Sequence, residues 1–287
     1  MSAPPADLRS GVRRPDAAAL AAVTLPRRRR SPRAVALTSL VVAAVVAVHV
    51  LAWNGTEFSL TALVDGRAGM ARFVAEAFPP DLDWTTVVRP GLEATVTTLW
   101  IGLLGTTLSV PFSLGLAVLA ARTTTPAAVL YQASRAVLSF LRAVPDIVFA
   151  LIFVTAVGLG PFSGVLALVV HNTGVMGKLW AEAMEETDPG PGEALRTTGA
   201  GRTQVVSHAV LPSVLPQLLG LLLYRFDVNV RSSLVLGLVG AGGIGFLITK
   251  AIKMFQFDQM LTYIVMVLVL VWVVDRFSAW ARARVGR

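Results

Sequence analysis

Long apolar segments recur along this chain, and they restrict its possible folds more than any other feature. The first covers Arg33 to Trp53, and several similar segments follow it toward the C-terminus. A transmembrane helix needs about 20 apolar residues, because it must cross a hydrocarbon core about 30 Å thick. Hydrophobic residues make up 55% of the 287-residue chain and charged residues only 15%. The sequence therefore predicts an all-α polytopic membrane protein.

The apolar segments and the polar connections between them predict six transmembrane helices. Their expected ranges are 33–53, 93–121, 136–158, 162–180, 209–230 and 261–274. Arginines cluster at both ends of the chain and between apolar segments, which is the pattern of cytoplasmic loops. We therefore expect a multi-pass protein of the cell membrane with both termini in the cytoplasm. The same arginines explain the net charge of +8, so no nucleic acid partner is expected.

Composition divides the chain into three expected regions. Residues 1–33 are rich in alanine, proline and arginine, which is typical of a disordered basic tail that contacts anionic lipid. Residues 34–92 hold the first transmembrane helix, interpreted as an uncleaved span and not a signal peptide, and a mixed-charge external segment. Residues 93–287 form the main transmembrane domain, with a cytoplasmic loop at residues 182–212.

The loop contains the polar, helix-prone segment EALRTTGAGRTQVVSHAVLP. Glu193 and Ala194 are expected to open a short helix. Gly199 then ends it, because glycine adopts the left-handed conformation without a Cβ clash. A second helical piece follows, and Leu211 with Pro212 opens the next apolar segment. A helix–glycine–helix hairpin outside the bilayer can serve as a binding surface for a soluble partner protein.

Charged side chains in the third expected helix form a further candidate site. Arg142 and Asp146 are four residues apart, so a cation and an anion would share one face of a continuous helix. Charges within a membrane are unfavourable in lipid, so they usually face a bundle interior or water. Two interpretations remain open: the pair locks two helices together, or it lines a translocation pathway.

The fifth expected helix carries the most polar intramembrane stretch of the chain. Its candidate pathway residues are Arg225, Asn229, Arg231, Ser232 and Ser233. Arg225 and Asn229 share one helix face, and Asp227 and Arg231 share another. One interpretation is a cationic relay for an anion. The alternative is a structural pair of Asp227 with Arg231, with Arg225 reaching outward.

Several chemistries are excluded by what the sequence lacks. The chain has no cysteine, and its three histidines are scattered, so neither a metal site nor a catalytic cluster is expected. Residues 240–245 match the pattern G-x-G-x-x-G, but no strand precedes them, so we reject a dinucleotide site. No Walker A pattern occurs anywhere. We therefore expect no enzyme activity and no cofactor in this chain.

The hairpin segment resembles the EAA loop of permease subunits of ABC importers, although Leu195 and Ala209 depart from the usual residues. Three other stretches, at 105–122, 142–168 and 224–245, resemble phosphonate-type permeases, and the resemblance covers roughly residues 85–280. It implies a type I importer architecture. It also implies a homodimer, two ATP-binding subunits that hold ATP and magnesium, and an external substrate-binding protein. In that family the loop is the coupling helix, and the substrates are phosphonates, phosphate or phosphite.

Other functions remain open at this stage. A methionine or amino-acid ABC permease would share the loop and the glycine-rich turn, and a heterodimer of permeases would share the architecture. A secondary transporter would need no ATPase and usually shows inverted repeats, of which we see none. A polytopic membrane enzyme would need a catalytic cluster that the sequence does not offer. Arginines suit phosphoryl groups, because the guanidinium fork donates two parallel hydrogen bonds.

Overall fold

The computed structural model describes residues 31–56 and 58–285, and in these ranges it is helical with no strand. Most of the expected 1–33 tail lies outside the described residues. The chain divides into two units, which meet between Arg67 and Ala68. The first unit contains α2 (Pro32–Gly55) and the short α3 (Leu60–Asp65). Ser31 caps α2 by accepting a hydrogen bond from a first-turn amide.

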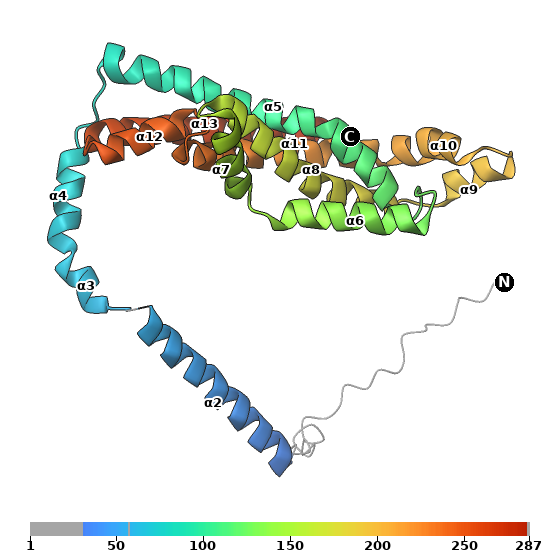
Figure 1. Cartoon of the computed structure of the whole chain (residues 1–287), viewed down its shortest axis with the longest axis horizontal. Coiled ribbons are helices and arrows are strands. Elements are labelled where there is room, and N and C mark those ends of the chain that lie inside the picture. The colour runs from blue at the N-terminus through green and yellow to red at the C-terminus, as the bar shows by residue number, and fades with distance from the viewer. Residues whose placement is uncertain (1–30, 57, 286–287) are drawn as a thin grey trace, which may run out of the picture. The chain divides into compact units, whose positions relative to one another are not determined.

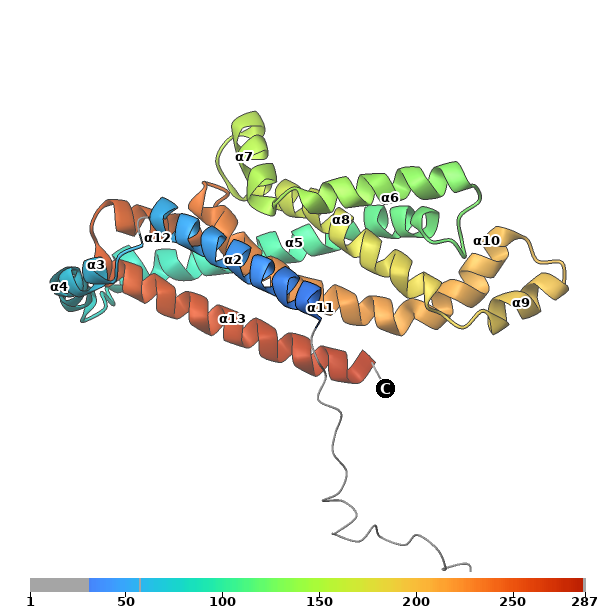
Figure 2. The ribbon, with the colours of Figure 1, turned by 90° about the horizontal axis from the view of Figure 1, so that it is seen from below.

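The second unit is a helical bundle (Figures 1 and 2). Its elements, in chain order, are α4 (Arg67–Ala77, which begins at the boundary), η1 (Trp84–Val88), α5 (Arg89–Ala120), α6 (Ala128–Ala143), α7 (Asp146–Val157), α8 (Pro161–Glu185), α9 (Gly190–Thr197), α10 (Arg202–Val205), η2 (Val206–Val210), α11 (Leu211–Leu238), α12 (Ile244–Lys253) and α13 (Phe257–Val285). Figure 1 shows α9 and α10 projecting at one end of the bundle and α12 at the opposite end. We call these the hairpin end and the α12 end.

Four helical segments of the described chain are long and apolar enough to span a membrane: Pro32–Gly55, Trp84–Ala120, Arg202–Leu238 and Phe257–Arg284. The pair α6–α7 is a fifth if its two helices, bent by 84°, form one span. The remaining bundle helix of sufficient length, α8, is less apolar. The expected six spans are reached only by counting α8 with these five. The fold is that of an all-α polytopic membrane protein.

Helix boundaries differ from the sequence expectation at four places. The fourth expected helix continues to Glu185 as α8, so the expected loop at 182–212 begins only after that residue. The third expected helix is not continuous, because Pro145 cannot donate a backbone hydrogen bond and the chain bends between α6 and α7. The fifth continues to Leu238 instead of ending near Val230, because its polar residues find partners inside the bundle. The sixth is longer at both ends, and α12, a separate amphipathic helix, precedes it.

Small residues let α5 lie directly against two neighbouring helices. A Cβ atom added at Gly105 would lie 2.5 Å from the Leu168 Cβ of α8, and one at Gly102 would lie 2.7 Å from a Val230 methyl of α11. No larger residue fits at either position without moving a helix. Both glycines are therefore positions of close helix–helix contact. Gly115 on the same helix is not, because no atom lies within 4 Å of a Cβ built there.

Asp83 fixes the start of the η1–α5 span at the α12 end. Its carboxylate accepts hydrogen bonds from the Thr85 and Thr86 amides at 2.9 and 2.8 Å and from both hydroxyls. These donors stabilise the charged form and hold the pKa of Asp83 at about 2. The helix α4 precedes this point, and its Phe73 ring packs against Phe257 of α13.

Candidate functional site

The hairpin expected from the sequence is present as α9, a turn at Gly199, and α10. Gly199 has a φ of +82°, the left-handed conformation that ends a helix. Its N–H donates to the Arg196 carbonyl at 3.1 Å, and the Ala200 N–H donates to the Leu195 carbonyl at 3.2 Å. This pair of bonds is a Schellman motif, which satisfies the last carbonyls of α9. The helix–glycine–helix geometry is therefore confirmed.

The exposed surface of the hairpin carries the predicted coupling residues. Glu193 lies in the first turn of α9, and it, Ala194 and Gly199 are exposed. Leu211 and Pro212 begin α11, which is the expected apolar segment, and the chain is helical without interruption from Arg202 to Leu238. The proline is tolerated because it stands in the first turn of α11, after the π-helical turn η2. The hairpin is thus joined rigidly to the long helix α11.

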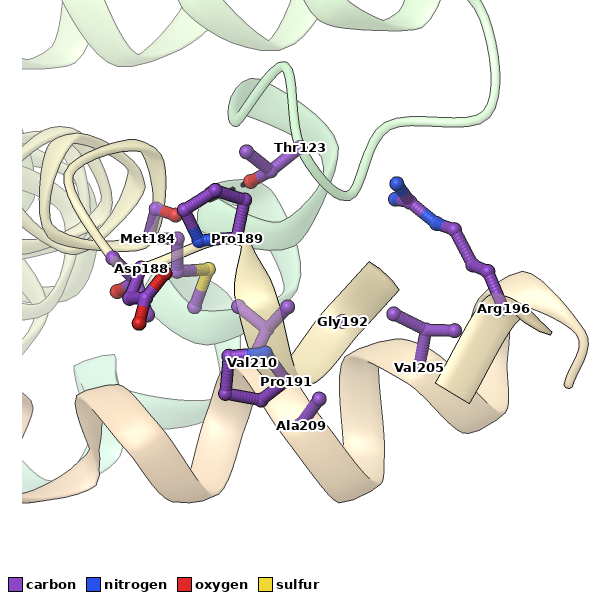
Figure 3. Close-up of a pocket in the computed structure, with 11 residues that line it drawn as sticks. Thr123, Met184, Asp188, Pro189, Pro191, Gly192, Arg196, Val205, Ala209 and Val210 are labelled. Atoms are coloured by element: carbon purple, nitrogen blue, oxygen red, sulfur yellow. Dashed lines mark hydrogen bonds between the residues drawn. The ribbon is translucent and has the colours of Figure 1, made fainter. Parts of the chain in front are cut away.

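The base of the hairpin is fastened to the connection between α5 and α6. Figure 3 shows a pocket there, lined by Thr123 of the connection, by Pro189 and Arg196 beside and on α9, and by Val205 of α10. The Arg202 guanidinium of α10 donates to the Thr125 carbonyl of the same connection. A movement of the hairpin would therefore reach α5 and α6 as well as α8 and α11.

An ion pair at the end of α8, which was not predicted from the sequence, holds the same connection. Glu185 accepts from the Arg135 guanidinium at 2.7 Å and from the Arg122 backbone N–H at 2.8 Å. Both arginines also lie over the Tyr131 ring. The Tyr131 hydroxyl accepts from the Arg122 side chain, which raises the pKa of that guanidinium. The residues are far apart in sequence, so no local pattern could reveal the cluster.

Arg225 lies at the centre of a buried polar network between α5, α8 and α11. Its Nε donates to Asn172 Oδ1 at 2.8 Å, and its Nη2 donates to Asn229 Oδ1 at 3.2 Å. The Asn229 amide donates in turn to the Thr106 hydroxyl at 2.8 Å, and the Asn172 amide donates to the Ser109 hydroxyl at 2.6 Å. Asn172, Thr106 and Ser109 are functional candidates that were not predicted from the sequence.

Arg231 occupies a different environment from Arg225. Its guanidinium pairs with Asp227, whose side chain is only 5% exposed, while half of the Arg231 side chain remains exposed. The expected division of the helix into two polar faces is therefore confirmed. Arg225, by contrast, points into the bundle, so the two arginines do not face one open surface. Ser232 is half-buried, and Ser233 is buried and donates to the Val230 and Thr98 carbonyls.

Arg142 and Asp146 do not form the expected pair on one helix face. Arg142 ends α6 and is exposed, while Asp146 begins α7 after the bend at Pro145, and no ion pair joins the two. The bend rests on α8: His171 Nδ1 donates to the Val144 carbonyl at 3.0 Å. His171 is adjacent in α8 to Asn172, which accepts from the Arg225 guanidinium. The bend and the Arg225 network thus belong to one region.

The glycine-rich segment forms the turn between α11 and α12. Gly240, Gly242 and Gly243 have φ values of +95°, +77° and +72°, which other residues rarely adopt. The turn packs against the α7–α8 turn, where the Gly160 N–H donates to the Gly240 carbonyl at 3.0 Å. It is preceded by a helix, so it has no strand–loop–helix context for a dinucleotide. Within residues 31–56 and 58–285, no cluster of His, Asp and Glu could hold a metal ion.

A long helical bundle with a short helical hairpin at one end, continuous with a membrane-spanning helix, defines a polytopic membrane subunit. Residues 113–287 match the family described as the binding-protein-dependent transport system inner membrane component. The chain belongs to this family. Membership makes it a multi-pass transport subunit and implies an ATP-binding partner and a substrate-binding protein.

Two similar relatives carry names that refer to phosphorus oxyanions. The phosphate-import permease protein PhnE of Mycolicibacterium smegmatis is 44% identical over 225 residues, which are 78% of this chain and 42% of that protein. This chain thus spans less than half the length of that relative. The phosphite transport system permease protein PtxC of Stutzerimonas stutzeri is 40% identical over 243 residues, which are 84% of this chain and 87% of that protein.

Solved structures of similar fold include the inward-facing MetNI methionine ABC transporter. One of its chains superposes with a TM-score of 0.58 at 25% identity, over 70% of this chain and 96% of that chain. The type I importer architecture implied by the sequence resemblance agrees with this likeness. The architecture and the family are therefore in accord with the expectations from the sequence.

Proposed function

We propose that this chain is the membrane-spanning permease subunit of an ATP-driven importer of phosphonate or a related phosphorus oxyanion, phosphate or phosphite. The observation that carries the proposal is the exposed α9–α10 hairpin on a chain 40% identical, over 84% of its length, to a phosphite transport permease. A methionine permease is the alternative. A relative of that kind, the methionine import permease MetP of Bacillus subtilis, is only 25% identical over 38% of the chain.

The hairpin is the element that would couple ATP hydrolysis to transport. We infer that Glu193, Ala194 and the Gly199 turn dock in a groove of an ATP-binding subunit, which holds ATP and magnesium. Movement of the docked hairpin passes to α11 through the continuous helix at Leu211 and Pro212. It passes to α8 through the short connection at 186–189, so the helices rock together. ATP shifts the conformational equilibrium only if the docked contacts differ between the two states.

A homodimer would complete the pathway. Half of the Arg231 side chain is exposed within a helix apolar enough to span a membrane. An arginine in lipid costs roughly 2.5–3.5 kcal/mol at the bilayer centre and less toward the interface. A second copy facing this surface removes that cost, and two-fold symmetry supplies each pathway residue twice. We place Arg231 and Ser232 on the pathway wall, with Arg225, Asn229, Ser233, Arg142 and Asp146 behind it or at its edge.

The substrate class is tested with the complete transporter, made of this permease, its ATP-binding subunits and its external binding protein in nanodiscs. We expect methylphosphonate, phosphite or phosphate to raise the rate of ATP hydrolysis several-fold over the ligand-free rate. Methionine, offered at the same concentration, should leave that rate unchanged. Stimulation by methionine, with no response to the three phosphorus oxyanions, would contradict the proposal and support the alternative.

Orientation is tested by cysteine labelling, which is clean here because the chain has no native cysteine. We propose that both termini are cytoplasmic, from the arginine clusters. A cysteine at Asp65 or at Pro161 should react with a membrane-impermeant maleimide from outside intact cells. A cysteine at Thr198, in the hairpin, should react only after the membrane is permeabilised. The reverse pattern of labelling would show that the orientation is inverted.

A further inference from the structure

The backbone of α5 determines which groups donate and which accept in the hydrogen bonds of the Arg225 network. The Thr106 hydroxyl donates its proton to the Gly102 carbonyl at 2.7 Å, and the Ser109 hydroxyl donates to the Thr106 carbonyl at 2.7 Å. Each hydroxyl oxygen can then only accept from an asparagine amide, because its single proton is used. Both asparagines must therefore turn their carbonyl oxygens toward Arg225. The network holds the guanidinium from two sides with neutral acceptors.

Arg225 is a buried cation without a contacting anion. The residue is 8% exposed, and both asparagines that bind it are completely buried. Across the part of the chain that the structure describes, no carboxylate lies within ion-pair distance of it, and Nη1 makes no hydrogen bond. A desolvated charge is unfavourable unless an opposite charge approaches it. Asp146 begins α7 at the α6–α7 bend, which His171 fastens to α8 next to Asn172.

We propose that Arg225 is the cation of an oxyanion-binding site inside each protomer, and that Asp146 is the counter-ion which the bound oxyanion displaces. The inference rests on the proposed function and assigns a site to its substrate. Asn172 and Asn229 are positioning residues: they occupy Nε and one proton of Nη2, which leaves Nη1 and the other Nη2 proton for two oxygens of a phosphoryl group. The α6–α7 bend carries Asp146, so its movement would open or close the site.

The α6–α7 bend is built to lie close to this site. A Cβ atom on Gly174 of α8 would lie 2.6 Å from the Leu141 Cβ and 2.7 Å from the Arg142 backbone nitrogen, so the last turn of α6 touches the α8 backbone. One turn before Gly174 on α8, His171 donates a hydrogen bond to the Val144 carbonyl of the bend. Asn172 lies between these two contacts on α8. The carboxylate and the guanidinium are therefore carried by elements that meet at one level of the bundle.

The site is tested by equilibrium binding of radiolabelled orthophosphate and methylphosphonate to the permease–ATPase complex in nanodiscs, without the external binding protein. We expect saturable binding to the wild type. Asp146→Asn removes the competing anion and should lower the Kd at least threefold. Asn172→Asp places a permanent carboxylate beside Nε and should weaken binding at least tenfold, while the melting temperature of the complex is kept or raised. Lys178→Gln removes a cation of α8 that pairs with Glu182 on the same helix, and should leave the Kd unchanged.

The two substitutions separate a binding site from a structural network. A network that only packs helices predicts an unchanged Kd for Asp146→Asn and unchanged binding for the stable Asn172→Asp variant, and either result overturns the site. Absence of saturable binding in a wild-type complex that performs ATP-driven uptake of either oxyanion also overturns it. A wild-type complex that takes up no phosphorus oxyanion overturns the proposed function instead, so the two failures are distinguishable.

Discussion

Replacing Gly199 by proline is expected to reduce ligand-stimulated ATP hydrolysis by at least tenfold while the protein still inserts and folds. Proline cannot adopt the φ of +82° at this position, and it removes the N–H that bonds to the Arg196 carbonyl. The turn that joins α9 to α10 is therefore lost, although both helices stay outside the packed bundle. A tenfold loss of rate corresponds to about 1.4 kcal/mol of activation free energy.

Asparagine at the same position is the matched control. It tolerates the left-handed conformation, and no atom lies within 4 Å of a Cβ built on Gly199. Gly199→Asn should therefore retain coupling, whereas Glu193→Ala, which removes an exposed charge and no internal contact, should lose part of it. Co-purification of the ATP-binding subunits and stimulated ATP hydrolysis are the measurements. Normal values for Gly199→Pro would show that the hairpin does not couple the subunits.

Gly105→Leu should strongly destabilise the bundle. A Cβ there lies 2.5 Å from that of Leu168, so a leucine forces α5 and α8 apart. Over-packing of a core usually costs about 1–3 kcal/mol, and backbone separation adds to that value. We expect the yield of monodisperse protein to fall sharply, with a lower melting temperature for the remainder.

Gly115→Leu on the same helix tests whether the effect comes from packing. Its added side chain meets no atom within 4 Å at the Cβ position, and leucine favours helix more than glycine does. Yield and melting temperature should therefore stay at wild-type values or rise. Equal losses from both substitutions would mean that glycine at these positions serves something other than contact between α5 and α8.

The sequence predicted those features that depend on neighbouring residues. Apolar segments, the α9–α10 hairpin and the pairing of Arg225 with Asn229 are set by composition or by a spacing of four residues along one helix. The partners of Asp146 could not be predicted, because a proline decides whether Arg142 and Asp146 share a helix. Pro145 interrupts a helix, whereas Pro212 does not, because it lies in the first turn of α11 and the helix stays continuous there.

Contacts between segments far apart in the sequence could not be predicted for a different reason. Glu185 holds Arg135 across 50 residues of chain, and Asn229 bonds to Thr106 across 123. No periodicity in the sequence marks such pairs, although a buried asparagine within an apolar segment is a signal that a polar partner must exist. Asn172 is such a residue, because it lies within the apolar segment that forms α8. Its presence indicated that a polar partner lies nearby, and that partner is Arg225.

Accumulation of labelled methylphosphonate or phosphate in proteoliposomes most directly tests the claim that this chain is the permease of an ATP-driven oxyanion importer. The liposomes would contain the permease and its ATP-binding subunits, with ATP inside the vesicles at the hairpin face and the binding protein at the opposite face. We predict uptake against a concentration gradient that requires ATP hydrolysis and the binding protein, and that is lost in Gly199→Pro. Uptake at an equal rate without ATP, driven by an ion gradient, would contradict the account.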